Sequence, residues 1–168
     1  MKFVDLSNSL SSYFGEPHGL SLVVSPFITN STLLDVLSDR CEEDVVVITS
    51  WRADHLLTGV SSLDLYEVCR DNKWTLFVND RVHMKIYSRD LEDCWSGSAN
   101  MTERGLSDED WSNHEALFFV DGLSSEARIR LQRLQSESVL VTDSVYRSYK
   151  EWFDEQDSID LPQDGPDI

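Results

Sequence analysis

The chain has 168 residues, of which 40% are hydrophobic and 10% aromatic, values typical of one folded domain with a single buried core. No run approaches the roughly 20 apolar residues of a membrane span, and the first residues lack the apolar stretch of a secretory signal, so we expect a cytoplasmic protein. The formal net charge of −17 weakens any non-specific attraction to nucleic acid or to an anionic membrane surface.

The first half of the chain alternates between strand and helix patterns. Runs of β-branched and aromatic residues predict strands at 20–28, 44–51 and 74–79. Periodic apolar positions predict two helices between these strands, at about 30–37 and 63–70. Such alternation predicts right-handed βαβ crossovers and parallel strand pairing. For the first helix we expect Asn30 or Ser31 as the cap, and an inner side formed by Leu33, Leu34, Val36 and Leu37.

The second half begins with further strand patterns and ends with two helices. Strands are predicted at 82–88, 94–100 and 114–120, and helices at 123–139 and 144–153. Alternation in the first of these strands places His83, Lys85 and Tyr87 on one face. The sequence therefore predicts an α/β fold, a mixed β-sheet sandwiched between helices. We expect one domain over residues 1–153 and a loose acidic tail over 154–168, which Pro162 and Pro166 interrupt.

The negative charge is not confined to the end of the chain. The last 18 residues hold seven acids and no Lys or Arg, and the other 150 residues still carry 14 positive and 24 negative groups. An anionic substrate would therefore need a local cationic groove, or a basic partner subunit that delivers it.

One stretch carries a specific motif. Residues 83–100 read HMKIYSRDLEDCWSGSAN, which has the form H-x-K-x4-D-x6-G-S-x-N. This pattern resembles the signature of the phospholipase D superfamily, and the continuation NMTERGL (100–106) also resembles the superfamily's usual extension. Six positions match at the family's spacing, which is far more specific than a lone H-x-K: His83, Lys85, Asp90, Gly97, Ser98 and Asn100.

The residue types at these positions suit the hydrolysis of a phosphodiester. The reaction needs a nucleophile, an acid for the leaving alkoxide and positive charge near the phosphoryl oxygens. A neutral imidazole at His83 can attack, and Lys85 offers a compact ammonium beside it. Ser98 and Asn100, two residues apart on a neighbouring predicted strand, add neutral hydrogen-bond donors. This chemistry needs no metal or other cofactor.

The resemblance implies more than the residues alone. It implies a phosphohistidine intermediate at His83 and a second histidine that protonates the leaving group. Because the chain has a single H-x-K, it implies a homodimer with one active site shared between two copies. It also implies that Glu115 hydrogen-bonds His83, although the preceding segment SDEDWSN is longer than is usual in the family. Asp90 is expected to be structural, and Gly97 to allow close backbone approach.

Other residues receive weaker assignments. Arg128, Arg130 and Arg133 are interpreted as a solvated helix face, because Glu126 lies four residues before Arg130 and Glu137 four residues after Arg133. Trp51 and Trp74 are interpreted as core residues, and the three scattered cysteines as free thiols in a reducing compartment. The candidates for a cationic groove are Arg52, Lys73, Arg81 and Arg89.

The predicted function is a metal-independent endonuclease on DNA, or on RNA, without a membrane partner. Its short length and repulsive charge suggest a larger assembly, such as a restriction or anti-phage defence complex with an ATPase or helicase partner. Two alternatives stay open. One is a phospholipase or phosphatidyl-transfer enzyme, and the other is an acidic interaction subunit that kept the motif without the activity.

Overall fold

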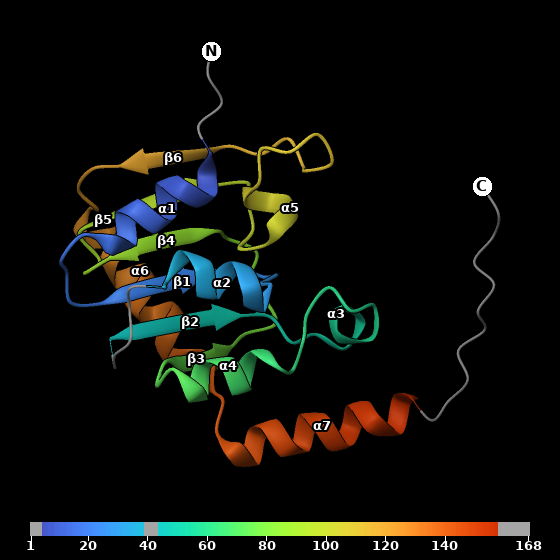
Figure 1. The fold of residues 1–168 in the computed structure, drawn as a ribbon. Coiled ribbons are helices and arrows are strands. Elements are labelled where there is room, and N and C mark those ends of the chain that lie inside the picture. The colour runs from blue at the N-terminus through green and yellow to red at the C-terminus, as the bar shows by residue number, and fades with distance from the viewer. Residues whose placement is uncertain (1–4, 39–43, 158–168) are drawn as a thin grey trace.

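The computed structural model describes residues 5–38 and 44–157, which build one seven-stranded sheet with helices on both faces (Figure 1). The strands are β1 Ser21–Val24, β2 Val45–Thr49, β3 Thr75–Val78, β4 Ile86–Arg89, β5 Asp93–Gly97, β6 Leu117–Val120 and β7 Val139–Leu140. The helices are α1 Leu6–Gly15, α2 Asn30–Val36, α3 Ala53–Leu57, α4 Leu65–Asp71, α5 Glu103–Leu106, α6 Ser125–Ser136 and α7 Asp143–Asp157.

The sheet is mixed, as the sequence predicts. Its strand order is β6-β5-β4-β1-β2-β3-β7, with β1, β2 and β3 parallel and every other pair antiparallel. The three parallel strands come from the half of the chain in which strands and helices alternate. The carboxyl ends of these strands consequently share one edge, on the right in Figure 1.

Alternate residues of each central strand pack into two separate cores. In β1, Val23 joins the core beneath α1, α2 and α4, whereas Leu22 and Val24 join the core beneath α6. Figure 1 shows α1, α2 and α4 in front of the sheet and α6 behind it. The central strands are buried on both faces, which explains their nearly continuous apolar sequence. Trp51 and Trp74 are buried as predicted.

Several predicted boundaries are wrong by a few residues. The cap of α2 is Thr29 instead of Asn30 or Ser31, and Leu34 is 38% exposed instead of facing the core. For α6 the predicted cap is confirmed, because Ser124 accepts a hydrogen bond from the backbone of Ala127. The helix predicted at 123–139 ends at Ser136, and Val139–Leu140 form β7, which pairs with β3. The sequence patterns did not indicate α1, α3, α5 or β7.

The last helix, α7, extends four residues beyond the predicted end of the domain at residue 153. Its aromatic side chains pack against the larger core, as the sequence predicts. The expectation of a loose tail falls mainly on residues 158–168, which lie outside the described residues.

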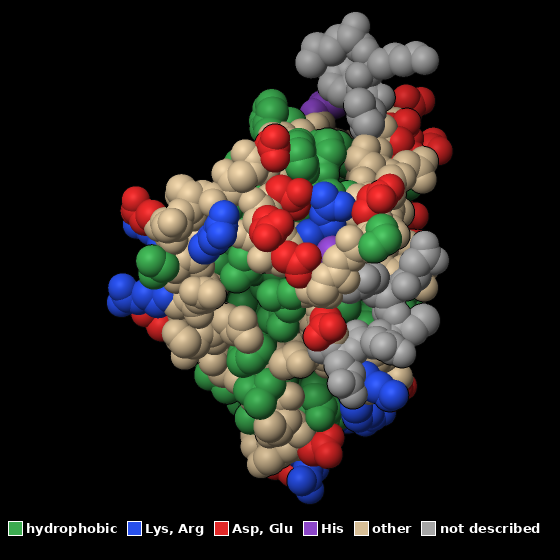
Figure 2. Space-filling view, turned by 90° about the vertical axis from the view of Figure 1, so that its left-hand side faces the viewer, with side chains coloured by type: hydrophobic (Ala, Val, Ile, Leu, Met, Phe, Trp, Pro, Cys, Tyr) green, Lys and Arg blue, Asp and Glu red, His purple; other side chains and the backbone are tan. Residues whose placement is uncertain are grey.

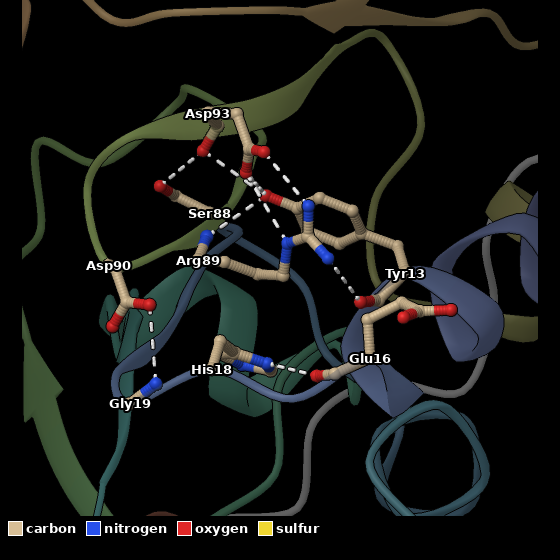
Figure 3. A network of polar contacts seen from close by, with 8 residues as sticks. All are labelled: Tyr13, Glu16, His18, Gly19, Ser88, Arg89, Asp90 and Asp93. Carbon is tan, nitrogen blue, oxygen red and sulfur yellow. Dashed lines mark hydrogen bonds and ion pairs between the residues drawn. The ribbon is translucent and has the colours of Figure 1, made fainter.

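A polar network joins α1 to the β4–β5 hairpin at the end of the sheet where the parallel strands begin (Figure 3). Tyr13 donates to Asp93, and the backbone N–H of Arg89 donates to the Tyr13 hydroxyl at 2.9 Å. The Arg89 guanidinium lies 4.0 Å from the centre of the Tyr13 ring and pairs with Asp93 at 2.9 Å. Burial alone would raise the pKa of Asp93, but hydrogen bonds from Arg89 and Tyr13 outweigh it and lower the pKa.

Asp90 has the structural role expected of it. Its carboxylate accepts hydrogen bonds from the backbone N–H groups of Gly19 and Leu20, at 3.2 and 2.6 Å. Its own backbone N–H donates to Leu20 at 2.8 Å, and its φ of 52° places it in the left-handed region. Asp90 therefore fixes the β4–β5 turn to the start of β1.

The same end of the molecule faces the viewer in Figure 2. In its upper half, Asp and Glu side chains surround Lys, Arg and His side chains, and hydrophobic side chains form a strip below them. Among the described residues, this end therefore presents no extended basic surface to an anionic ligand.

Candidate active site

The motif residues meet near the carboxyl ends of the parallel strands. β4 runs antiparallel to β1 with Ile86 opposite Val24, so the chain just before Ile86 lies beside the end of β1. β5 lies on the other side of β4, with Ser96 opposite Ile86, and it ends at Gly97. Open α/β sheets commonly bind ligands at this edge, because the connections leaving the parallel strands form a crevice there.

His83 and Lys85 precede β4 instead of lying within it. The prediction of a strand over 82–88 is wrong at its start, because β1 is followed by Ser25 and Pro26. Proline has no backbone N–H, so it cannot continue the hydrogen-bonded ladder toward His83. The prediction that Tyr87 shares a face with His83 also needs correction. The Tyr87 side chain is fully buried and donates to the carbonyl of Ala99 at 2.7 Å, whereas His83 is exposed.

Both the side chain and the backbone of Lys85 form hydrogen bonds. Its ammonium donates to the carbonyl oxygen of His83 at 2.9 Å, and its own carbonyl accepts from the hydroxyl of Ser96 at 3.0 Å. The ammonium thus lies beside the backbone that carries the imidazole. Partial burial lowers the pKa of Lys85, and the negative charge of Glu115 opposes that shift.

Gly97 and Ser98 form a close contact with the segment that leads into β6. A Cβ atom on Gly97 would lie 2.0 Å from the carbonyl oxygen of Ala116, so no side chain fits there. The backbone of Ser98 donates to that carbonyl at 2.9 Å, and the hydroxyl of Ser98 accepts from the Ala116 N–H at 3.1 Å. The Ser98 hydroxyl keeps its own proton for donation to a ligand.

The side chain of Asn100 lies next to Ser25, a buried residue that sequence reasoning missed and whose hydroxyl also donates to the carbonyl of Phe27 at 2.8 Å. The Ser25 hydroxyl lies 3.3 Å from the side-chain oxygen of Asn100 and accepts from the backbone N–H of Met101 at 3.2 Å. Because its oxygen faces Ser25, the amide group of Asn100 can present its two N–H donors elsewhere. The signal in the sequence that could have found Ser25 is its position between the apolar run of the first predicted strand and Pro26.

Glu115 lies just before β6, next to the motif strands. Its carboxylate accepts from the side chain of Asn113 at 3.3 Å, and its charge acts on Lys85. Within the described residues no hydrogen bond joins Glu115 to His83, so the positioning role of Glu115 stays a prediction.

The four candidate groove cations separate into two pairs. Arg52 and Arg81 follow the ends of β2 and β3, at the same edge as His83, and pair with Asp54 and Glu137. Lys73 and Arg89 lie at the opposite end of the sheet, so they are not groove residues.

Known structures support the fold independently of the motif. NucT from Helicobacter pylori superposes with a TM-score of 0.60 and 15% identity, covering 82% of this chain and 91% of its own. Nuc from Salmonella typhimurium, a phospholipase D family member, gives a TM-score of 0.62 and 14% identity over 81% of this chain and 90% of its own. The chain therefore shares the fold of these two proteins.

A third similar structure is TrmBL2, an archaeal chromatin protein with DNA-binding activity. It gives a TM-score of 0.51 and 12% identity, and the match covers 80% of this chain but 49% of TrmBL2. No protein-family profile and no curated protein sequence matches the chain.

Within this fold, all five candidate catalytic residues lie in the connecting segments at one end of β4, β5 and β6. Among residues 5–38 and 44–157, no group of three His, Cys, Asp or Glu side chains is placed to hold a metal ion. No helix in this part of the chain is both long and apolar enough to cross a membrane.

Proposed function

We propose that the chain is a phosphodiesterase that cuts nucleic acid, with DNA favoured over RNA. The observation that supports this best is the placement of His83, Lys85, Ser98, Asn100 and Glu115 at one edge of a phospholipase D nuclease fold. Their side chains supply a nucleophile, a fixed positive charge, neutral donors and an acid to orient the imidazole.

The proposed reaction has two balanced steps. A ring nitrogen of His83 attacks phosphorus, a P–N bond forms, and the P–O bond to the leaving group breaks. The proton for the leaving alkoxide comes from His83 of a second copy across a two-fold axis. That second imidazole then takes a proton from water, which attacks phosphorus and releases the first histidine. The Lys85 ammonium and the Asn100 amide stabilise the negative charge on the phosphoryl oxygens in both steps. No metal takes part.

The first experiment tests the activity and its nucleophile. Single- and double-stranded DNA and RNA are incubated with the chain in EDTA, and wild type is compared with His83→Ala. We expect cleavage by wild type and a loss of at least about 1,000-fold in the variant. A matched control is His18→Ala, because His18 contacts Glu16 and Ser21 at the opposite end of the sheet. A strict Mg²⁺ requirement, or equal losses in both variants, would contradict the proposal.

A mixing experiment tests the shared site. Wild-type and His83→Ala subunits are unfolded, mixed and refolded together, so that mixed dimers form. If each site needs both histidines, a mixed dimer is inactive, and an equal mixture retains about a quarter of the activity instead of half. Linear dependence on the wild-type fraction would show that each subunit acts alone.

We further propose that the chain works in the cytoplasm, as the nuclease subunit of a restriction or anti-phage assembly in which a DNA-translocating ATPase or helicase brings the substrate. The net charge of −17 supports this, because it opposes unaided binding to DNA. The purified chain should therefore cleave long DNA slowly at physiological salt. It should cleave short substrates faster, because they carry less charge and are repelled less. Fast, complete cleavage of long DNA by the chain alone would overturn this part.

A further inference from the structure

A hydrophobic cavity opens at the start of the edge strand β6. Its volume is about 440 Å³, and it lies between α1, β5 and the segment 107–113. Its apolar wall consists of Leu6, Trp95, Leu117 and Phe118, and its rim includes the three consecutive acids Asp108, Glu109 and Asp110. We name this cavity and its rim the acidic groove.

The strand beside the acidic groove has a free edge. Within the described residues β6 pairs with β5 alone, so one row of its backbone groups is open for pairing. Its three consecutive apolar side chains are unusually exposed, with Phe118 at 68%, Phe119 at 46% and Val120 at 39%. Exposed apolar edge strands are either aggregation hazards or sites where another chain adds a strand.

The charges around the acidic groove are of one sign. Asp108, Glu109 and Asp110 are exposed, and none of them forms an ion pair with any described residue. A neighbouring cavity of about 250 Å³ shares Asp108 and Glu109 and adds three further acids, Asp5, Asp35 and Glu103. Among the described residues, no Lys or Arg lines either cavity. Their field repels nucleic acid and attracts cationic groups.

Hydrogen bonds within the segment 107–113 and to α5 hold the rim in place. The hydroxyl of Ser112 donates to the carbonyl of Glu109 at 2.7 Å, and the backbone of Glu109 donates to the hydroxyl of Ser107 at 3.2 Å. The backbone of Asn113 donates to the carbonyl of Arg104 at 2.9 Å, which fastens the segment to α5. A partner therefore meets a pre-organised surface, which reduces the ordering cost of binding.

We propose that the acidic groove and the free edge of β6 form the docking site for a basic, extended segment of a partner protein. The segment pairs with β6 as an added strand, places an apolar side chain in the cavity and sets Lys or Arg side chains over Asp108–Asp110. Charge decides against the other occupants. In a two-fold contact between two acidic grooves the like-charged rims would face each other, and nucleic acid is repelled by every charged side chain of the rim.

Synthetic peptides test this directly, with anisotropy of a fluorescent label measured against the full chain. The probe is a twelve-residue peptide of alternating Lys and Val, compared with alternating Glu and Val and with alternating Lys and Ser. We expect binding of Lys–Val, no binding of Glu–Val, and at least about tenfold weaker binding of Lys–Ser, which has no apolar anchor. Equal binding of Lys–Val and Glu–Val would overturn the proposal.

Two variants separate a local site from global charge. Asp108→Lys, Glu109→Lys and Asp110→Lys together should weaken Lys–Val binding at least about tenfold. A control with the same change in net charge at positions away from β6, Asp44→Lys, Glu126→Lys and Glu151→Lys together, should change it less than about threefold. Equal losses would mean that the peptide responds to net charge alone.

The strand pairing and the anchor have their own tests. A Lys–Val peptide that is N-methylated along one edge should lose binding, because it cannot donate hydrogen bonds to β6. Phe118→Ser, at an exposed position, should weaken binding while the thermal midpoint is retained. Undiminished binding in both experiments would show that the peptide does not add to β6. These outcomes do not depend on nuclease activity.

Discussion

At the end of the sheet where the parallel strands begin, the Arg89 cation has its partners inside the protein. It lies between the ring of Tyr13 and the carboxylate of Asp93 (Figure 3). At the other end, the ammonium of Lys85 touches only a backbone carbonyl among its described neighbours, and His83 is exposed beside it. Both cations flank the same strand, β4. A paired cation is part of the structure, whereas an incompletely paired one can still bind an anion.

The largest expected effect comes from exchanging the two cations for a neutral side chain of similar length. Lys85→Met should lower cleavage about 100- to 1,000-fold with little change in thermal stability, because it removes charge stabilisation of the transition state. Arg89→Met should lower the free energy of unfolding by about 2 kcal/mol, because Asp93 loses a charged hydrogen bond. Cleavage rates and denaturant titrations of both variants provide the measurement. Loss of activity without loss of stability in Arg89→Met would show that Arg89 acts in catalysis and not in holding the fold together.

Gly97→Ala probes the backbone contact between β5 and the segment before β6, next to the candidate catalytic residues. The added Cβ would overlap the carbonyl of Ala116, so β5 and the segment before β6 have to separate. We expect a loss of about 2–4 kcal/mol in the free energy of unfolding. The neighbouring Ser98→Ala removes one hydrogen bond and should cost about 1 kcal/mol. Equal stabilities of the two variants in urea would show that this contact is unimportant.

Asp93→Asn tests, through the pH dependence of stability, the end of the sheet where the parallel strands begin. Because the folded pKa of Asp93 is lowered, its contribution to stability is present above its ordinary pKa and is lost as the pH falls through the lowered value. The variant should therefore be less stable than wild type by about 1–2 kcal/mol at neutral pH. The difference should shrink in acid. A constant difference between neutral and strongly acidic pH, measured by thermal melts, would contradict the assigned pKa direction.

The smallest effect is expected from Glu115→Gln. The Glu115 charge raises the pKa of Lys85 against the effect of burial, so its removal should lower that pKa. Since catalysis needs the protonated ammonium, the alkaline decline of the cleavage rate should begin at a lower pH than in wild type. Glu126→Gln, on the distant helix α6, serves as the control. An unshifted alkaline limb would remove Glu115 from the vicinity of Lys85.

Sequence reasoning predicted most of what depends on local patterns. Alternation of strands and helices gave the three parallel strands, and the motif spacing gave the residues that meet at one edge. It missed α1, whose polar sequence gives little periodic signal, and it placed the start of β4 too early. The hydrogen-bonded ladder stops there because Pro26 follows the neighbouring strand β1 and has no backbone N–H to donate. The residue pattern of one strand does not show which strand will lie beside it.

The cysteines illustrate the same division. The sequence predicted free thiols, and Cys69 and Cys94 are free and buried; Cys41 lies outside the described residues. Burial raises the pKa of the Cys69 thiol to about 12, which only the packing of α4 against the sheet could reveal.

The sequence by itself determined which reactive side chains the protein contains, how they are spaced along the chain and where most strands and helices form. Motif spacing and hydrophobic periodicity are local properties, so they can be read without the structure. Only the tertiary structure decided which of those groups are already paired. Arg81 and Arg89 are both groove candidates in the sequence, and strand direction places them at opposite ends of the sheet. The same applies to Ser25 and to the exposed face of β6, whose roles arise from contacts between segments that are remote in sequence.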